Sequence, residues 1–374
     1  MSKLYVIVGA YEPNGAPTNR LLSFINIFEK RGIKTEVVFI APNHLRDKVV
    51  HSYQNVTFRY LWEKSLIKNR IYDKLLGGCR VKYFCKQLKK DDNVFLFGAS
   101  GYLHYFTSHN DINVYHERTE HPDVVRLRFG FERRRYIANC KKLTGLFVIS
   151  TALKKYFSSI GVHEKKITIV NMTVDPSRFE RVHKDESAEK YIAYCGTASN
   201  NKDGVNKLIE AFGIVAKKHK DVKLYIIGKT PSSSDESGNL QLIENLGLKE
   251  QVVFTGVVPA EQMPQLLTNA TVLALARPDS LQAQNGFPTK LGEYLLTANP
   301  VVVTKVGDIP LFLKDGESAL LAEPGNVQEF ANKLCWALEH PEEASHIGNR
   351  GCDIALMNFN ASIETTKIIN TIIH

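Results

Sequence analysis

The chain runs twice through the same pattern, in which short apolar runs alternate with longer amphipathic segments. At the start, an apolar run at residues 4–8 precedes a turn, a helical stretch at about 18–31 and a β-branched run at 35–40. This order is typical of a β-α-β unit and predicts a parallel sheet with helices on both faces. The alternation continues with apolar runs at 94–97, 112–115 and 146–149.

The pattern starts again in the second half, with apolar runs at residues 191–194, 223–227, 251–254, 271–276 and 300–303. The 374 residues exceed the size at which one hydrophobic core usually stops growing, about 250–300 residues. We therefore predict an α/β fold of two Rossmann-like, doubly wound domains that face a central cleft. The predicted domains are residues 1–172 and 173–357, and a C-terminal helix at about 358–374 is expected to pack back on the first. The stretch 171–187 is the predicted junction, and 232–239 is predicted to be an exposed loop.

The six cysteines are scattered, without a Cys-x-x-Cys pair or a histidine at metal-binding spacing. We therefore predict neither disulfides nor a metal site, and interpret the cysteines as small buried residues in a reducing compartment. The first residues do not form the apolar region of a secretory signal, and no stretch approaches the ~18 apolar residues of a membrane-spanning helix. The expectation is a cytoplasmic protein whose membrane contact, if any, is peripheral, at the inner face of the plasma membrane.

The net charge of +9 is unevenly distributed along the chain. Residues 1–182 contain 31 Lys and Arg against 16 Asp and Glu, whereas residues 183–374 contain 17 against 23. Two interpretations of the basic half stay open: a solvated surface, or a surface that approaches an anionic membrane or a phosphate-bearing acceptor. No nucleic-acid-binding motif accompanies the charge, so nucleic acid is not expected as a partner.

Ligands of open α/β sheets bind beyond the carboxyl ends of the strands, so the residues after each apolar run are the first candidates. Gly15 follows the first run and could bring its backbone close to a phosphate, although a tight turn is the simpler explanation. His116 follows the run at 112–115 and lies among Glu117, Glu120 and His121. A histidine there can bind a substrate hydroxyl or have a structural role, and the sequence favours neither.

The most specific segment is 285–293, which reads Asn-Gly-Phe-Pro-Thr-Lys-Leu-Gly-Glu. Pro288 suits the first turn of a helix, and Gly286 before it lets the chain bend so that backbone N–H groups point outward. An anionic diphosphate is well placed at such a helix start. Glu293 lies early in the predicted helix, where its carboxylate could accept hydrogen bonds from two ligand hydroxyls.

Several motifs together resemble glycosyltransferase family 4, a large retaining family with the GT-B fold. Residues 144–150 look like the last strand of the family's N-terminal domain and its terminal serine. Residues 194–212 look like the family's signature of glycine, lysine, glycine and Leu-Ile-x-Ala-Phe. With Phe254-Thr255-Gly256 and the segment 285–293, the resemblance covers nearly the whole chain.

The resemblance implies a nucleoside-diphosphate sugar as the donor. Lys202 would bind the donor diphosphate, and Gly286 and Phe287 would offer backbone N–H groups to it. Glu293 would hold the ribose, and His116 corresponds to the family's histidine near the donor sugar. The predicted catalytic residues are His116, Lys202 and Asn285, and the predicted donor-binding residues are Gly15, Gly196, Lys202, Gly228, Gly256, Val257, Asn285, Gly286, Phe287, Pro288 and Glu293.

Three departures from the family pattern concern the donor site. Asn285 stands where the family's E-x7-E motif has its first acid, so the donor sugar would meet a neutral amide. Thr197 replaces a basic residue that often follows the glycine of the first strand in the second domain. Lys202 would therefore bind the donor diphosphate without a basic residue at this position. The first loop has Gly15 where many members have two adjacent glycines.

The function that the resemblance implies is a retaining glycosyltransferase, hexosyl- or related. It would move a sugar to a glycan or lipid-linked acceptor in cell-surface polysaccharide synthesis, without a metal or other cofactor. Two alternatives stay open. A nucleotide-sugar-binding protein without turnover is favoured by Asn285 and Thr197, and a sugar-nucleotide epimerase of the same architecture fits the segment 285–293 less well.

Overall fold

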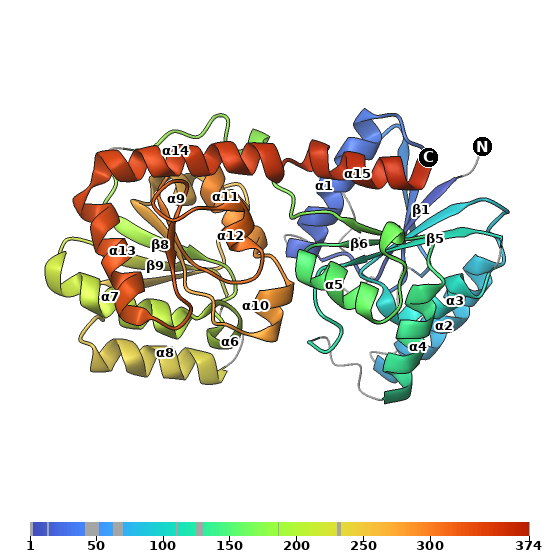
Figure 1. Cartoon of the computed structure of the whole chain (residues 1–374), viewed down its shortest axis with the longest axis horizontal. Coiled ribbons are helices and arrows are strands. Elements are labelled where there is room, and N and C mark those ends of the chain that lie inside the picture. Colours follow the sequence, from blue (N-terminus) through green and yellow to red (C-terminus); the bar gives the residue numbers. More distant parts are fainter. Residues whose placement is uncertain are drawn as a thin grey trace. The chain divides into compact units, whose positions relative to one another are not determined.

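The computed structural model describes residues 3–12, 15–41, 52–62, 70–109, 111–124, 130–185, 187–229 and 233–373 (Figure 1). The chain forms two compact units, Met1–Asn171 with Ala361–His374, and Met172–Asn360. The predicted boundaries at 172/173 and 357/358 lie one and three residues from these. Pro13 and Asn14, in the predicted first loop, lie outside the described residues. Across the described ranges, no helix combines the length and the apolarity that crossing a bilayer requires.

The first unit is built on a parallel sheet with the strand order β3-β2-β1-β4-β5-β6-β7. The direction of winding reverses between β1 and β4, as in a doubly wound fold. The side chains of β4 are all buried, as expected for a strand covered on both faces. The strands are β1 (Leu4–Val8), β2 (Thr35–Phe39), β3 (Val56–Tyr60), β4 (Asn93–Phe97), β5 (Asn113–Arg118), β6 (Gly145–Val148) and β7 (Ile167–Ile169).

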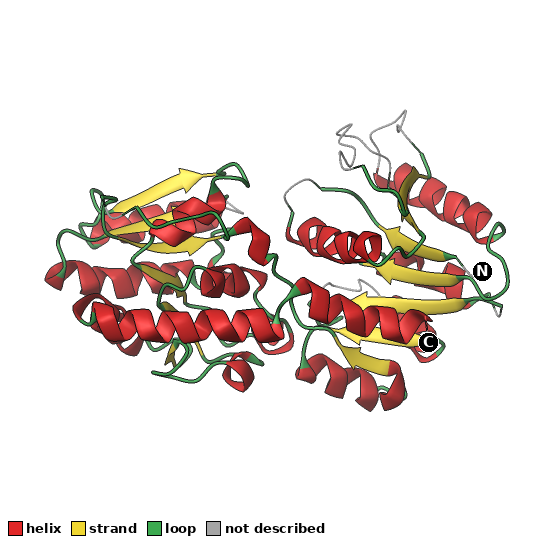
Figure 2. Ribbon diagram, turned by 90° about the horizontal axis from the view of Figure 1, so that it is seen from above, coloured by secondary structure: helices red, strands yellow, loops and turns green. Residues whose placement is uncertain are grey.

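Helices lie on both sides of this sheet (Figure 2). The C-terminal helix α15 (Ala361–Ile373) packs against α1 (Ala16–Lys30), as the sequence predicted for residues 358–374. The buried Glu364 carboxylate accepts a hydrogen bond from the backbone N–H of Asn171 (2.7 Å), which fixes α15 to the end of the unit. The other helices are α2 (Arg70–Cys85), α3 (Leu103–Thr107), α4 (Gly130–Lys141) and α5 (Thr151–Ser159).

A buried ion pair holds α1 against the sheet of the first unit. Arg20 donates from Nε to the Glu117 carboxylate on β5 (2.9 Å). Its other nitrogens donate to the carbonyl oxygens of Val170 (3.0 Å) and Asn171 (2.7 Å). Because all of these groups find partners, the charges are tolerated in the core.

The second unit has a parallel sheet with the strand order β10-β9-β8-β11-β12-β13. The winding reverses between β8 and β11, so the carboxyl ends of these two strands form the switch point at which ligands of such sheets bind. The strands are β8 (Tyr191–Cys195), β9 (Lys223–Ile227), β10 (Val252–Gly256), β11 (Val272–Leu275), β12 (Val301–Thr304) and β13 (Leu320–Ala322).

Helices also cover both faces of the second sheet (Figure 2). The short helix α6 begins a few residues after the carboxyl end of β8, and α10 begins a few residues after that of β11. Helix α11 follows α10. The described helices are α6 (Asn200–Asp203), α7 (Val205–Lys218), α8 (Ser233–Asn245), α9 (Met263–Asn269), α10 (Leu281–Asn285), α11 (Thr289–Leu296), α12 (Ile309–Phe312), α13 (Val327–Glu339) and α14 (Pro341–Asn358).

Two local predictions are wrong. Residues 233–239 of the predicted loop 232–239 form the first half of α8, in which Asn239 and Ile243 are buried. The strand predicted to end at residue 115 continues to Arg118, so His116 lies inside β5 rather than after it. The longer strand is stabilised by pairing of His116 with Leu96 on one side and Leu146 on the other.

Replacement of two helical glycines of the second unit by alanine should have opposite effects on the free energy of unfolding. A Cβ on Gly348 of α14 would lie 2.2 Å from the Ala298 carbonyl oxygen, whereas a Cβ on Gly238 of α8 would meet nothing within 4 Å. We expect Gly348→Ala to lower the free energy of unfolding by about 1–3 kcal/mol through overpacking. The matched control Gly238→Ala should raise it by about 0.5–1 kcal/mol, because alanine favours the helix. Urea unfolding measures both, and equal effects would contradict the packing described for α14.

Candidate functional site

Three glycines end neighbouring strands at the carboxyl edge of the second sheet. The Gly196 N–H donates to the Ile227 carbonyl oxygen (2.8 Å), and the Gly228 N–H donates to the Gly256 carbonyl oxygen (2.9 Å). Gly228 has φ +130°, and a Cβ there would lie 2.2 Å from the Gly196 carbonyl oxygen. Only glycine fits this approach. The structure therefore brings Gly196, Gly228 and Gly256 together beside the exposed Val257.

The buried Asp203 carboxylate joins this edge to α11. It accepts hydrogen bonds from the Lys290 ammonium (2.5 Å) and from the Tyr194 hydroxyl (2.7 Å). Arg277, also buried, approaches the other carboxylate oxygen with Nε at 3.9 Å. Two cations around one carboxylate leave a net positive charge at the switch point of the sheet.

The Lys290 ammonium lies in a confined position. It lies 4.7 Å from the centroid of the Tyr194 ring and 3.1 Å from the Tyr194 hydroxyl, and its side chain is 16% exposed. Burial lowers the pKa of Lys290, and Asp203 acts in the opposite direction. Burial, with the Asp203 charge, raises the pKa of Tyr194, so that its hydroxyl is a hydrogen-bond donor to Asp203.

Lys290 and Arg277 are residues to which the sequence assigned no role. A Cβ on Gly196 would lie 2.4 Å from the Lys290 ammonium nitrogen, so this cation contacts the backbone just before Thr197. Lys290 thus places positive charge beside the position where the resemblance expects a basic residue. The signals for both were present: Lys290 is inside the segment 285–293, and Arg277 directly follows the apolar run 271–276.

Lys202 extends from the one-turn helix α6, next to Asp203, and is exposed. The Ser199 hydroxyl caps α6 by accepting from the Lys202 N–H (3.3 Å). Gly204, which ends α6, has φ +68°, and a Cβ there would lie 2.0 Å from the Ala276 carbonyl oxygen. This close approach fixes Lys202 on the same edge as Lys290 and Arg277.

Glu293 lies on α11 as predicted and is 26% exposed. Its carboxylate pairs with Arg178, which follows Pro176 in a 3-10 turn (Pro176–Arg178) and also donates to the Ala260 carbonyl oxygen (3.2 Å). A ligand hydroxyl at Glu293 therefore has to share the carboxylate with Arg178.

The residues before α11 differ in part from the prediction. The Gly286 N–H donates to the Gln282 carbonyl oxygen (2.9 Å), so it is used to end α10 instead of facing a ligand. Pro288 is the residue before α11, which begins at Thr289, and Phe287 is buried against Phe312 and Phe359.

Asn285 ends α10 and is 8% exposed. Its side-chain amide nitrogen donates to the Leu281 carbonyl oxygen (2.9 Å), one turn earlier in the same helix. The residue at the position of the missing acid thus contributes to helix structure, and its predicted catalytic role stays a prediction.

His116 and Gly15 belong to the first unit. His116 is 0% exposed, and its Nδ1 lies 3.1 Å from the Leu96 carbonyl oxygen. Since a carbonyl only accepts, Nδ1 carries the proton and Nε2 accepts from the Tyr136 hydroxyl (3.3 Å). The Gly15 N–H donates to the Glu12 carbonyl oxygen (3.1 Å) just before α1, so this group already has a partner within the first unit.

The second unit matches the sequence model of the family described as "Glycosyl transferases group 1", over residues 189–340. MMP alpha-(1->4)-mannosyltransferase of Mycolicibacterium hassiacum is 24% identical over 66% of this chain and 58% of its own length. The capsular polysaccharide biosynthesis glycosyltransferase CapM of Staphylococcus aureus is 26% identical over 61% of this chain and 62% of its own. The chain thus spans about three fifths of the length of these curated relatives.

These matches support a glycosyltransferase of the family 4 type. The crystal structure of Anabaena HepE in complex with UDP is similar over 99% of both chains, with a TM-score of 0.77 and 18% identity. The sucrose-phosphate synthase of Thermosynechococcus elongatus covers 99% of this chain and 98% of its own, with a TM-score of 0.78 and 14% identity. The predicted α/β fold of two doubly wound GT-B domains is confirmed by these likenesses.

The burial of His116 predicts an acid sensitivity that can be measured. Burial, with a smaller effect of Arg118, lowers the pKa of His116 to about 3, whereas an unfolded histidine has a pKa near ~6.5. Between these values only the unfolded chain binds the proton, so this group makes stability fall as pH falls below ~6.5. From pH ~6.5 to pH ~5 the loss should be about 2 kcal/mol.

We expect His116→Asn, which keeps a donor toward Leu96, to flatten the decline in unfolding free energy between pH ~7 and ~5 by about 2 kcal/mol. Urea unfolding at a series of pH values measures this difference. The control His346→Asn changes an exposed histidine on α14 and should retain the wild-type pH dependence. An unchanged slope in His116→Asn would contradict a buried neutral imidazole.

Proposed function

We propose that the protein is a retaining glycosyltransferase that moves a sugar from a nucleoside-diphosphate sugar to a glycan or lipid-linked acceptor. A role in cell-surface polysaccharide synthesis is part of the proposal, and the relative CapM, named for capsular polysaccharide biosynthesis, supports it. The observation that carries the proposal is the group of cations Lys202, Lys290 and Arg277 at the switch point of the second sheet. Fixed positive charge at that place fits a diphosphate.

UDP and GDP sugars are the first donors to test. HepE was crystallised with UDP and with UDP-glucose, and a relative from Mycolicibacterium smegmatis is named as GDP-mannose-dependent. In the proposed complex the diphosphate meets exposed Lys202 directly and Lys290 beside Gly196. The ribose hydroxyls bind the Glu293 carboxylate and compete there with Arg178. The glycine ends of β8, β9 and β10 let the nucleotide approach the backbone.

The proposed chemistry is electrostatic. As the bond between the sugar and the diphosphate breaks, negative charge grows on the leaving phosphate, and Lys202 with the Lys290 and Arg277 pair stabilises it. The departing diphosphate oxygen takes the proton of the attacking acceptor hydroxyl, so the acceptor attacks from the face that the diphosphate leaves and the configuration is retained. These fixed cations supply the charge that a metal would otherwise supply, so we propose metal-independent transfer.

Two residues enter this reaction differently from what the family pattern implies. His116 is neutral at pH ~7 because its pKa is lowered to about 3, so it could orient a hydroxyl but not supply a positive charge. A sugar hydroxyl would have to replace the Tyr136 hydroxyl at Nε2. Asn285 gives the donor sugar an uncharged neighbour, which favours the second candidate function, a nucleotide-sugar-binding protein without turnover.

Lys202→Ala and Glu293→Gln test the donor site. Wild type should unfold at a higher temperature with one nucleoside-diphosphate sugar and should hydrolyse or transfer its sugar. Lys202→Ala should lower turnover about 10²-fold, by analogy with removal of one charge-stabilising donor. Glu293→Gln should weaken binding of the nucleoside diphosphate without abolishing the fold. The control Lys249→Ala changes an exposed cation of the same unit and should match wild type.

The outcomes separate the transferase from the binding protein and from the epimerase. Binding with neither hydrolysis nor transfer in wild type would favour a binding protein, and inversion at a carbon of the donor itself would identify an epimerase. Unchanged donor affinity in both Lys202→Ala and Glu293→Gln would show that the donor site lies elsewhere.

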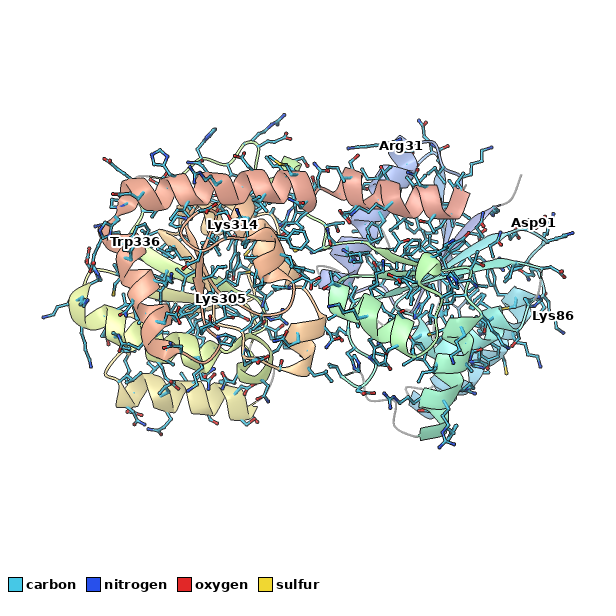
Figure 3. All side chains as sticks on the ribbon, in the orientation of Figure 1. Arg31, Lys86, Asp91, Lys305, Lys314 and Trp336 are labelled. Atoms are coloured by element: carbon cyan, nitrogen blue, oxygen red, sulfur yellow. The ribbon has the colours of Figure 1, made fainter. Side chains whose placement is uncertain are left out.

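We also propose that the first unit approaches an anionic membrane surface. Helix α4 exposes Arg134 and Arg135, and Lys86, labelled in Figure 3, is exposed in the turn directly after α2. Tyr83 on α2 and Phe131 on α4 are 67% and 65% exposed. Basic residues with exposed aromatic rings are typical of surfaces that bind the membrane interface.

Flotation with vesicles tests the membrane proposal. Wild type should float with vesicles that contain phosphatidylserine and much less with neutral phosphatidylcholine vesicles. Arg134→Gln with Arg135→Gln should lower the partition coefficient about 30-fold, at about 1 kcal/mol for each charge. Lys217→Gln with Lys218→Gln removes two exposed charges from the second unit and should leave flotation unchanged. Equal flotation with both vesicle types would refute the proposal.

A further inference from the structure

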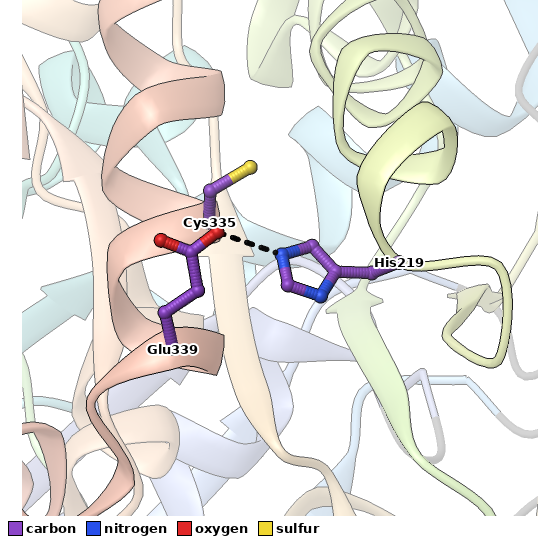
Figure 4. Close-up of side chains that lie close together, drawn as sticks. All are labelled: His219, Cys335 and Glu339. Carbon is purple, nitrogen blue, oxygen red and sulfur yellow. Dashed lines mark hydrogen bonds and ion pairs between the residues drawn. The ribbon is translucent and has the colours of Figure 1, made fainter.

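His219, Cys335 and Glu339 bring three different metal-binding groups together at one corner of the second unit (Figure 4). Their donor atoms all lie within 4.8 Å of one another, and His219 Nε2 lies 3.2 Å from a Glu339 carboxylate oxygen. Cys335 is buried, the His219 side chain is 20% exposed and that of Glu339 is 45% exposed. The group therefore has a buried thiol at its base and an open side through which an ion can enter.

Two packed helices position these residues. His219 directly follows α7, and its backbone N–H continues the helix by donating to the Val215 carbonyl oxygen (2.9 Å). Cys335 and Glu339 are four residues apart on α13 and so lie on one face of that helix, which packs against α7. Neighbouring Trp336, labelled in Figure 3, stacks on His340 and stiffens the end of α13.

Each of the three donor groups is of a kind that binds zinc in proteins. A thiolate, an imidazole and a carboxylate occupy three positions of a tetrahedral zinc ion, and water occupies the fourth. With metal–ligand distances of about 2.0–2.3 Å, the donor atoms of such a site are about 3.3–3.7 Å apart. The imidazole and carboxylate, 3.2 Å apart, nearly meet this spacing. The thiol lies within 4.8 Å of both, so it needs a shift of at most about 1 Å.

We propose that His219, Cys335 and Glu339 bind a zinc ion that clamps the end of α7 to the end of α13. Burial raises the pKa of the Cys335 thiol, so coordination releases its proton to water as the sulfur–zinc bond forms. The clamp lies at the amino-end edge of the sheet, because β9 begins just after it and ends at the glycine edge. Its expected effect is on the stability of the contact between α7 and α13, and it is independent of the proposed glycosyl transfer.

Cobalt(II) titration of the reduced, chelator-treated full chain tests the clamp. Wild type should bind one equivalent, with a sulfur-to-cobalt charge-transfer band and the absorption of a tetrahedral ion, and zinc should displace the cobalt. Cys335→Ser should lose the band. Glu339→Gln can keep a hydrogen bond to His219 but should bind at least about tenfold more weakly. Zinc should raise the unfolding temperature of wild type and not of Cys335→Ser.

Cys79→Ser is the matched control, because Cys79 is an exposed cysteine of the first unit, and it should bind cobalt like wild type. The absence of a charge-transfer band in wild type would overturn the proposal and leave His219 and Glu339 as a simple ion pair. A charge-transfer band that persists in Cys335→Ser would overturn the proposal too. A band that is unaffected by both Glu339→Gln and His219→Ala would also overturn it, because it would indicate that the cysteine binds the metal without the other two residues.

Discussion

The Asp203 carboxylate holds together the edge of the second sheet at which the candidate donor site is built. It bonds to Lys290 from α11 and to Tyr194 from β8, and it lies close to Arg277 after β11. Loss of one partner from a buried ion pair commonly costs about 3–5 kcal/mol, because the remaining charge is uncompensated. The Asp203 carboxylate therefore compensates the charges of Lys290 and Arg277 in their buried positions. It also fixes these positions before an anion binds.

The alternation of apolar runs was sufficient to predict both sheets, because strands buried on two faces are continuously apolar. It was not sufficient for β3, an edge strand in which exposed residues alternate with buried or half-buried ones, or for the three-residue strands β7 and β13. Residues 233–239 resemble a loop in composition, and they are helical because α8 buries Asn239 and Ile243. Packing against the rest of the unit decides whether such a segment is a helix or a loop, and this packing cannot be read from a single sequence.

The candidate site shows the same limit at the level of side chains. Local motifs indicated Lys202, Glu293 and the strand-end glycines, since each lies in a short pattern. The pairs Asp203 with Lys290 and Arg178 with Glu293 join residues about a hundred positions apart, and His219 and Cys335 are equally distant in sequence. His116 lies in a sequence cluster of histidines and glutamates that allowed a substrate-binding role. Because β5 extends to Arg118, His116 is inside the strand, and both of its ring nitrogens form hydrogen bonds within the first unit.

A crystal structure of the protein with bound UDP tests the central claim most directly. The account predicts the diphosphate beside Gly196, with Lys202 and Lys290 near its oxygens, and the ribose hydroxyls on the Glu293 carboxylate in place of Arg178. A nucleotide bound away from the carboxyl ends of β8 and β9, or a diphosphate that touches neither lysine, would contradict it.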